Sequence, residues 1–204
     1  MLRWFMTALF LPLALLAMDA PDTIQAWPDT VQLAGKDFPV PDWWRGLRLG
    51  NLGDPRPRDL RRLPSILCEK GRPIYLREDA WEYFITMAFK AYRDGVYLVV
   101  NSGYRSSHTQ TKIVEKRLAQ GRSFRNIARS VAPPGYSEHM LGTTIDLSLG
   151  GNYKSNPAYH WLRAHGEDFG FTESYAEHSG SGIVWEPWHW RWRRPEKNPP
   201  DLLP

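Results

Sequence analysis

The sequence predicts a single α+β domain, in which a small antiparallel sheet is covered by helices on one side. Three observations predict this class: apolar residues at helical spacing over 78–93, a β-branched run over 96–100, and two later segments that alternate polar with apolar residues. The length of 204 residues and a hydrophobic content of 42% suit one globular domain with a substantial core.

The clearest helix is expected over residues 78–93. Its apolar side chains recur at intervals of three and four positions, which places them on one face. They are Trp81, Phe84, Ile85, Ala88 and Phe89. An Asp-Gly pair follows the last of the periodic residues and is a typical helix end.

Three further helices are expected, over 107–119, from 124 towards 131, and over 157–169. Ser123 and Asn156 stand where N-cap residues are favoured, and Asn156 is followed by a proline that suits the first helical turn.

Besides a short strand over 74–76, three strands are expected, over 96–100, 143–149 and 183–192. The first is continuously apolar and reads as a buried strand. The second alternates polar and apolar residues, so Asp146 faces the polar side of the sheet. The third places its tryptophans on one face, and His189 and Arg191 on the other.

The helices and strands expected above define a catalytic domain over residues 78–194. Three segments lie outside it. Residues 1–20 combine a basic Arg3 with an apolar run that is short for a membrane span, which indicates a secretory signal or an uncleaved N-terminal anchor. Residues 21–77 are rich in Pro and Arg and predict an irregular lead-in that wraps the domain. Residues 195–204 form a Pro-rich tail.

Charge and cysteine content narrow the classes of partner and metal site. A net charge of +4 favours anionic partners such as nucleic acid, a membrane surface or an acidic polymer. Export would exclude nucleic acid and favour the cell envelope, with membrane contact only through an uncleaved N-terminal segment. Cys68 is the one cysteine, so a multi-cysteine zinc site is excluded and any metal must be held by His and carboxylates.

The segment Ser137-Glu138-His139-Met140-Leu141-Gly142-Thr143-Thr144-Ile145-Asp146 contains the first candidate metal ligands. His139 and Asp146 are seven positions apart, and in one straight strand they would face opposite sides. Both reach one ion only if the chain turns between them, and Gly142 is where it is able to turn. Zinc accepts imidazole nitrogen and carboxylate oxygen, and a catalytic zinc typically has three protein ligands and a water.

The segment Trp185-Glu186-Pro187-Trp188-His189-Trp190 supplies a third candidate ligand, His189, and a carboxylate three residues earlier. Pro187 cannot donate to a sheet ladder, so Glu186 is expected in a bend that leans towards the metal side. A glutamate beside a water activated by zinc is what metal-assisted hydrolysis needs.

A third polar group follows the strand expected at 96–100, in Ser102-Gly103-Tyr104-Arg105-Ser106. Arg105 offers a fixed fork of donors that suits a carboxylate or a developing oxyanion. Ser106 and Gln110 are expected to assist it. Tyr104 and Trp188 complete the set of expected substrate contacts.

These residues carry a family resemblance. SGYRSSHTQ, PPGYSEHMLGTTIDLS and GIVWEPWHWR, in this order and spacing, resemble the VanY-type D-alanyl-D-alanine carboxypeptidases, in the superfamily of lysostaphin-like peptidases and the hedgehog amino-terminal domain. The resemblance covers about residues 78–194. Thr144 stands where the family usually has alanine, a departure that leaves every candidate ligand in place.

The resemblance implies a zinc-dependent D-alanyl-D-alanine carboxypeptidase that hydrolyses the terminal peptide bond of peptidoglycan stem peptides. The protein is expected to be exported to the periplasm or cell envelope and to be a monomer. The resemblance also implies one Zn²⁺ on His139, Asp146 and His189, with Glu186 as the catalytic base. Arg105 would then act on the substrate carbonyl or carboxylate. Ser137 and Gln110 fall on positions that help to hold the terminal carboxylate in relatives.

Two alternatives stay open from the sequence. The same scaffold serves an endopeptidase or an L,D-carboxypeptidase, which would differ in loops such as residues 175–182. A non-hydrolytic envelope-binding module stabilised by zinc belongs to a different class. Glu186 and Arg105 count against that module, since a structural zinc needs neither.

Overall fold

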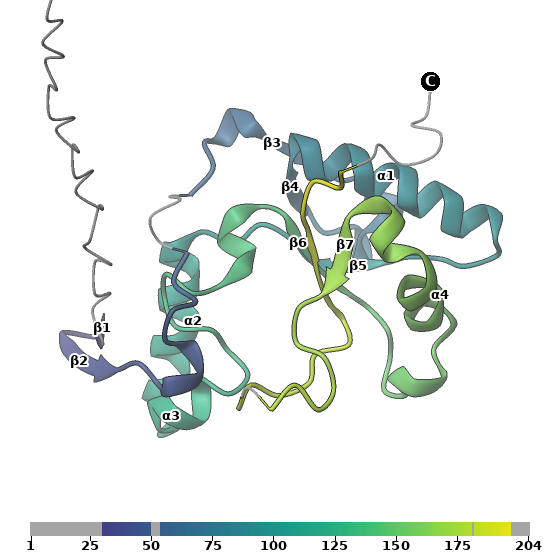
Figure 1. The fold of residues 1–204 in the computed structure, drawn as a ribbon. Coiled ribbons are helices and arrows are strands. Elements are labelled where there is room, and N and C mark those ends of the chain that lie inside the picture. Colours follow the sequence, from purple (N-terminus) through teal and green to yellow (C-terminus); the bar gives the residue numbers. More distant parts are fainter. Residues whose placement is uncertain (1–29, 50–53, 181, 197–204) are drawn as a thin grey trace, which may run out of the picture.

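The computed structural model describes residues 30–49, 54–180 and 182–196, and its centre is a four-stranded antiparallel sheet (Figure 1). The strands are β5 (Val100–Ser102), β6 (Thr144–Leu147), β7 (Phe171–Glu173) and β8 (His189–Trp192), in the order β5-β6-β8-β7. The predicted α+β class, with a small antiparallel sheet and helices, is confirmed.

One face of the sheet is apolar and packs on two helices, α1 (Glu78–Arg93) and α4 (Pro157–His165) (Figure 1). Ile145 lies opposite Trp190 in the register of β6 and β8, and both side chains are buried in this core. Because side chains alternate along a strand, the next pair, Asp146 and His189, faces the other side of the sheet. The sheet therefore carries its polar residues on the face away from α1 and α4.

A second core lies beside that polar face and is built around α2 (Ser107–Ala119) and the short α3 (Phe124–Ile127). The hairpin of β1 (Thr30–Leu33) and β2 (Lys36–Pro39) packs against these helices, and Trp44 donates from its indole nitrogen to the Ala128 carbonyl at 2.7 Å. This part of the chain forms the second wall of the cleft described below.

The lead-in over residues 21–77 contains more regular structure than the sequence predicted, beyond the short strand expected over 74–76. Besides the β1–β2 hairpin, β3 (Leu60–Arg62) pairs with β4 (Tyr75–Arg77). The irregular lead-in expected from the sequence is thus corrected for its described residues. These strands are three or four residues long, and such short segments leave too little alternation for a period to be recognised.

The predicted helices agree well with the structure, and the predicted strands are too long. Helices α1 and α2 have the expected bounds, and α4 continues as a 3₁₀ turn, η8 (Gly166–Phe169), to the expected end. The helix expected from 124 towards 131 stops at Ile127. The strand expected over 96–100 begins only at Val100 and runs on to Ser102. The strand expected over 183–192 begins at His189, since the chain turns at Pro187 and Trp188.

The signal or anchor expected over residues 1–20 lies outside the described residues, as do residues 197–204 of the Pro-rich tail. In the described part of the chain, no helix combines the length and the apolar character that crossing a membrane requires.

Candidate metal centre and active-site cleft

A cleft of about 290 Å³ lies between the polar face of the sheet and the second core. Its walls combine ionisable side chains with apolar ones, as ligand sites usually do. The residues lining it are Trp44, Arg105, Gln110, Ile113, Arg117, Ser130, Val131, Ala132, Ser137, Glu138, His139, Asp146, Tyr175, Ile183, Glu186, Trp188 and His189.

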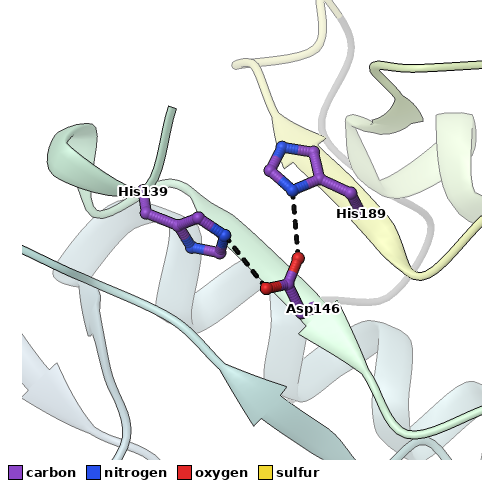
Figure 2. Close-up of side chains that lie close together, drawn as sticks. All are labelled: His139, Asp146 and His189. Atoms are coloured by element: carbon purple, nitrogen blue, oxygen red, sulfur yellow. Dashed lines mark hydrogen bonds and ion pairs between the residues drawn. The ribbon is translucent and has the colours of Figure 1, made fainter. Parts of the chain in front are cut away.

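His139, Asp146 and His189 come from three elements and meet in this cleft (Figure 2). Each offers one ligand atom, and the three atoms lie within 4.8 Å of one another. His139 is on the 3₁₀ turn η6 (Glu138–Leu141), which ends at Gly142 in the left-handed conformation with φ +70°. The chain therefore turns between His139 and Asp146 at the glycine, as the sequence predicted.

The ring of His139 is oriented by a backbone carbonyl. Nδ1 lies 2.7 Å from the Gly103 oxygen, and because a carbonyl only accepts, Nδ1 carries the proton and donates. Nε2 then faces Asp146 Oδ2 at 3.1 Å. Burial lowers the pKa of His139 despite the nearby Asp146, which favours the neutral imidazole that metals bind.

His189 lies between two carboxylates. Nε2 is 3.1 Å from Glu138 Oε2, and Nδ1 is 3.0 Å from Asp146 Oδ1. Burial alone would lower the pKa of His189, but the hydrogen bonds with Asp146 and Glu138 raise it to about 9. A histidine ligand usually donates its second N–H to a carboxylate or carbonyl, and Glu138 is placed to accept it here.

The donor set fits a zinc ion. In the neutral imidazoles, lone pairs on His139 Nε2 and His189 Nδ1 would face the carboxylate of Asp146, which is repulsive unless a proton or a cation lies between them. Burial alone would raise the pKa of Asp146, but the two histidines hold it well below its usual range, so the carboxylate stays ionised. Two imidazoles and one carboxylate are a typical catalytic zinc set with a position left for water.

Glu186 stands at the edge of this group, in the bend before β8. Its carboxylate Oε2 lies 3.8 Å from His189 Nδ1, and its side chain is 12% exposed. Burial raises the pKa of Glu186 to about 7, because desolvation outweighs the opposing effect of His189. A carboxylate with a pKa near neutrality is suited to accept and return a proton.

Arg105 is held on the other side of Asp146, at 3.9 Å from Nη2 to Oδ2. Its Nη1 donates to Gln110 Oε1 and its Nη2 donates to Ser102 Oγ, both at 3.0 Å. Burial lowers the pKa of Arg105, and the nearby Asp146 and Glu186 partly offset this effect. The guanidinium is thereby positioned beside the candidate metal site with donors still available.

The other expected substrate contacts divide into two groups. Ser137, Gln110 and Trp188 line the cleft, whereas Tyr104 and Ser106 are not among its lining residues. The Ser106 hydroxyl instead accepts from the Thr109 backbone N–H at 3.2 Å and caps α2. Tyr104 contributes through its backbone N–H, which donates to the Tyr75 carbonyl at 2.8 Å.

Several lining residues received no functional role from the sequence, among them Trp44, Arg117, Glu138 and Tyr175. Glu138 accepts from His189 and, at 2.8 Å, from Arg191. Burial alone would raise the pKa of Glu138, but the hydrogen bond from His189 lowers it to about 2. In the sequence, only the position of Glu138 next to His139 indicated a role at the site. Its partners on β8 are some fifty residues away in the chain, so their contact with Glu138 could not be predicted.

The fold and the site are typical of a metallopeptidase, with three candidate metal ligands, a carboxylate suited to act as a base and an arginine in one cleft. Comparison with known proteins shows which family of metallopeptidases this is. The chain belongs to the VanY family, described as D-alanyl-D-alanine carboxypeptidase, whose family model matches residues 73–195, more than half of the chain.

The curated relatives include a D-alanyl-D-alanine carboxypeptidase of Enterococcus faecalis, which is 34% identical over 110 residues. The match covers 48% of this chain and 41% of that protein, so the chain corresponds to less than half of the relative's length.

Three solved structures are similar. A mutant of the vancomycin resistance D,D-pentapeptidase VanY in complex with Zn(II) is 28% identical with a TM-score of 0.56, over 71% of this chain and 82% of the other. VanYB in complex with D-alanine-D-alanine is 27% identical with a TM-score of 0.54, over 71% and 84%. The LD-carboxypeptidase LdcB shares the fold, with 24% identity and a TM-score of 0.63, over 80% and 83%.

Proposed function

We propose that this protein is a zinc-dependent D,D-carboxypeptidase that removes the terminal D-alanine from peptidoglycan stem peptides. The observation that carries the proposal is the grouping of His139, Asp146 and His189 with Glu186 and Arg105 in one cleft. The proposal is supported by membership of the VanY family and by the similar structures that hold Zn(II) or D-alanine-D-alanine.

Zinc bound by the three ligands would supply Lewis acidity, which lowers the pKa of a water molecule and polarises the scissile carbonyl. Glu186, within reach of this position, accepts the proton of the attacking water and returns it to the leaving amine. Arg105 donates to the carbonyl oxygen as negative charge develops on it. Glu138 and the Gly103 carbonyl hold the two imidazoles in the orientation that binding needs.

The proposal also covers the localisation of the enzyme and its oligomeric state. The substrate lies outside the cytoplasmic membrane, so residues 1–20 serve as an export signal or anchor. The ligands, the base and the arginine all come from one chain, which is consistent with a monomeric enzyme.

The test is to incubate the zinc-loaded protein with monomeric pentapeptide, monomeric tetrapeptide and crosslinked dimer muropeptides, and to identify the products by mass spectrometry. Loss of one alanine from the pentapeptide is expected. Cleavage of the tetrapeptide alone would indicate an L,D-carboxypeptidase, and cleavage of dimers alone an endopeptidase.

Glu186→Gln is the matched control for this experiment. It is expected to lower turnover by about 10² to 10⁴, because the general base is lost, while zinc content and folding stay unchanged. If the wild-type protein is folded and binds zinc but cleaves none of the muropeptides, the result would favour the envelope-binding module.

A further inference from the structure

The positive charge of the protein is concentrated on one part of the fold. Residues 107–137, which contain α2 and α3, carry six lysines and arginines but one acidic residue, Glu115. The other residues of the chain carry 20 basic and 21 acidic side chains, so the net charge of +4 comes from this segment. Helices α2 and α3 lie on the side of the molecule away from α1 and α4 (Figure 1).

Neighbouring acids do not neutralise this charge. Glu115 is half-buried, and its Oε1 accepts from the Ala34 N–H at 2.8 Å. The lead-in residues 30–49, part of which packs on these helices, carry three basic and two acidic side chains. Five cations of the segment are exposed, and within the described ranges none of them forms an ion pair. They are Lys112, Lys116, Arg122, Arg125 and Arg129.

Two of these arginines, Arg122 and Arg129, line an open hollow of about 650 Å³. Among the described residues its lining contains no carboxylate, and it includes Ser123, Asn126 and Ser130. Ser123 Oγ accepts from the Asn126 N–H at 3.3 Å, and Ser130 Oγ accepts from an arginine on α2 at 3.4 Å. Because both oxygens already accept, their hydroxyl hydrogens are available to donate. The hollow therefore combines two guanidinium groups with further donors, which suits an oxyanion.

The hollow adjoins the active-site cleft. Ser130 lines both, and the Val184 N–H, on the loop that leads to Glu186, donates to the Arg129 carbonyl at 2.9 Å. Neither Arg122 nor Arg129 lines the cleft. A polymer bound across the hollow would thus lie beside the cleft without entering it.

The chemistry of this surface favours a phosphate polymer over a lipid bilayer. Three of the five exposed cations are arginines, whose planar fork pairs with phosphate oxygens through two parallel hydrogen bonds. The cations extend from Lys112 on α2 to Arg129 beyond α3, so they are able to contact several charged groups of one polymer. Binding in a membrane interface also needs exposed apolar side chains. Among the described residues, none of the large exposed apolar side chains comes from α2 or α3.

We propose that this basic surface, made of Lys112, Lys116, Arg122, Arg125 and Arg129, binds an anionic envelope polymer whose repeating units are linked through phosphate. The bound polymer holds the protein against the cell wall and leaves the cleft free for a stem peptide. The inference goes beyond the proposed function, since it rests on the proposed localisation in the envelope but not on catalysis.

The experiment measures binding of poly(glycerol phosphate) to the zinc-loaded protein by calorimetry. The double variant Arg122→Gln, Arg129→Gln is expected to bind the polymer about 10- to 30-fold more weakly, because each arginine close to an anionic surface contributes about fivefold in affinity. Wild-type affinity is expected to fall as salt rises, and to fall less steeply in the double variant. A wild type that does not bind the polymer would overturn the inference.

The matched control is the double variant Arg62→Gln, Arg93→Gln. Both arginines are exposed, lie on β3 and α1 outside the basic surface, and remove the same two charges when substituted. Polymer binding is expected to change by less than about threefold. An equal loss in the two double variants would show that only the net charge matters, and would overturn the assignment to α2 and α3.

Vesicles of phosphatidylglycerol and phosphatidylcholine test a membrane as the partner. At equal phosphate concentration, the wild type is expected to bind the polymer more tightly than the vesicles. Tighter binding to the vesicles would overturn the choice of a polymer.

Activity measurements distinguish failure of this inference from failure of the proposed function. In Arg122→Gln, Arg129→Gln, hydrolysis of a soluble pentapeptide is expected to stay unchanged, while release of alanine from intact walls that carry the polymer falls. A wild type that binds the polymer but hydrolyses no peptide would contradict the proposed function and support the inference. A wild type that hydrolyses the peptide but binds no polymer would overturn the inference alone.

Discussion

Three carboxyl groups in this cleft are buried, but they differ in protonation. Glu186 is largely buried beside Asp146 and Glu138, where an ionised carboxylate is destabilised. Asp146 and Glu138 are also buried, but each contacts a histidine and remains ionised. Three nearby acids thus differ in protonation because their partners differ, which suits Asp146, Glu138 and Glu186 to the separate roles of ligand, support and base in the proposed function.

The raised pKa of Glu186 predicts how stability varies with pH. Because its folded-state pKa of about 7 is above the unfolded value of 4.5, the folded protein binds the extra proton between these values. Its contribution to stability is complete below pH 4.5 and is lost as pH rises through 7, a change of about 3 kcal/mol. In the presence of a chelator, Glu186→Gln is therefore expected to raise the melting temperature more at pH 8 than at pH 5.

The measurement is thermal unfolding of both proteins at the two pH values. The difference between them isolates Glu186, since all other titrating groups are shared. An increase in melting temperature that is equal at pH 5 and pH 8 would contradict the buried, proton-binding state of this carboxyl.

At the scale of elements, the lead-in strands support the turn that carries His139. The Arg77 N–H on β4 donates to the Gly142 carbonyl at 2.7 Å, and the Arg105 N–H donates to the His139 carbonyl at 3.1 Å. Gly103, whose carbonyl orients the His139 ring, lies so close to β4 that a Cβ there would be 2.6 Å from the Tyr75 oxygen. The candidate metal ligands are therefore positioned partly by a segment that contributes none of them.

Gly142→Ala tests this support. The substitution places a side chain at φ +70°, and the new Cβ would lie 3.2 Å from Leu60 Cδ2 and 3.3 Å from the Arg77 nitrogen. We expect a loss of about 1–3 kcal/mol in the free energy of unfolding, from backbone strain and crowding, together with weaker zinc binding.

Gly121→Ala is the matched control, because Gly121 has φ +82° but open space around its Cβ position. It is expected to cost only about 1 kcal/mol and to leave zinc affinity unchanged. Chemical denaturation and zinc titration measure both quantities. A Gly142→Ala protein that behaves like Gly121→Ala would show that the contact with β3 and β4 is unimportant.

At the scale of the whole molecule, the cleft joins two separately packed cores. One contains the apolar face of the sheet with α1 and α4, and the other contains α2, α3 and the β1–β2 hairpin. The histidines and Asp146 come from the first side, and Arg117 with its apolar neighbours from the second. In the proposed function, substrate binding therefore depends on how the two cores meet.

Zinc is expected to stabilise the whole fold, because its ligands come from three separate elements and are not preformed in the unfolded chain. Free zinc at a hundredfold excess over its dissociation constant should add about 2.7 kcal/mol to the free energy of unfolding. Calorimetry with zinc or with chelator measures the shift in melting temperature. Asp146→Asn removes the charged ligand and should abolish most of this shift, and a wild type insensitive to zinc would contradict the site.

The sequence by itself determined the helices and the identity of the candidate ligands. The apolar periodicity of α1, the cap at Asn156 and the turn glycine Gly142 are local properties, and local properties can be recognised in a single sequence. Glu186 was also expected in a bend, because Pro187 cannot pair in a sheet. The strands β1, β2 and β3 of the lead-in were missed because they are too short to show a period, and their pairing depends on distant partners.

Only the tertiary structure decided which role each of these side chains has. Glu138 becomes the partner of His189 because η6 and β8 meet across fifty residues of sequence. Ser106 is a helix cap, and Gln110 is a support for Arg105. Arg117 faces the cleft because α2 packs beside the sheet. Contacts between elements depend on packing, and burial and neighbouring charge then set the protonation and the role of each side chain.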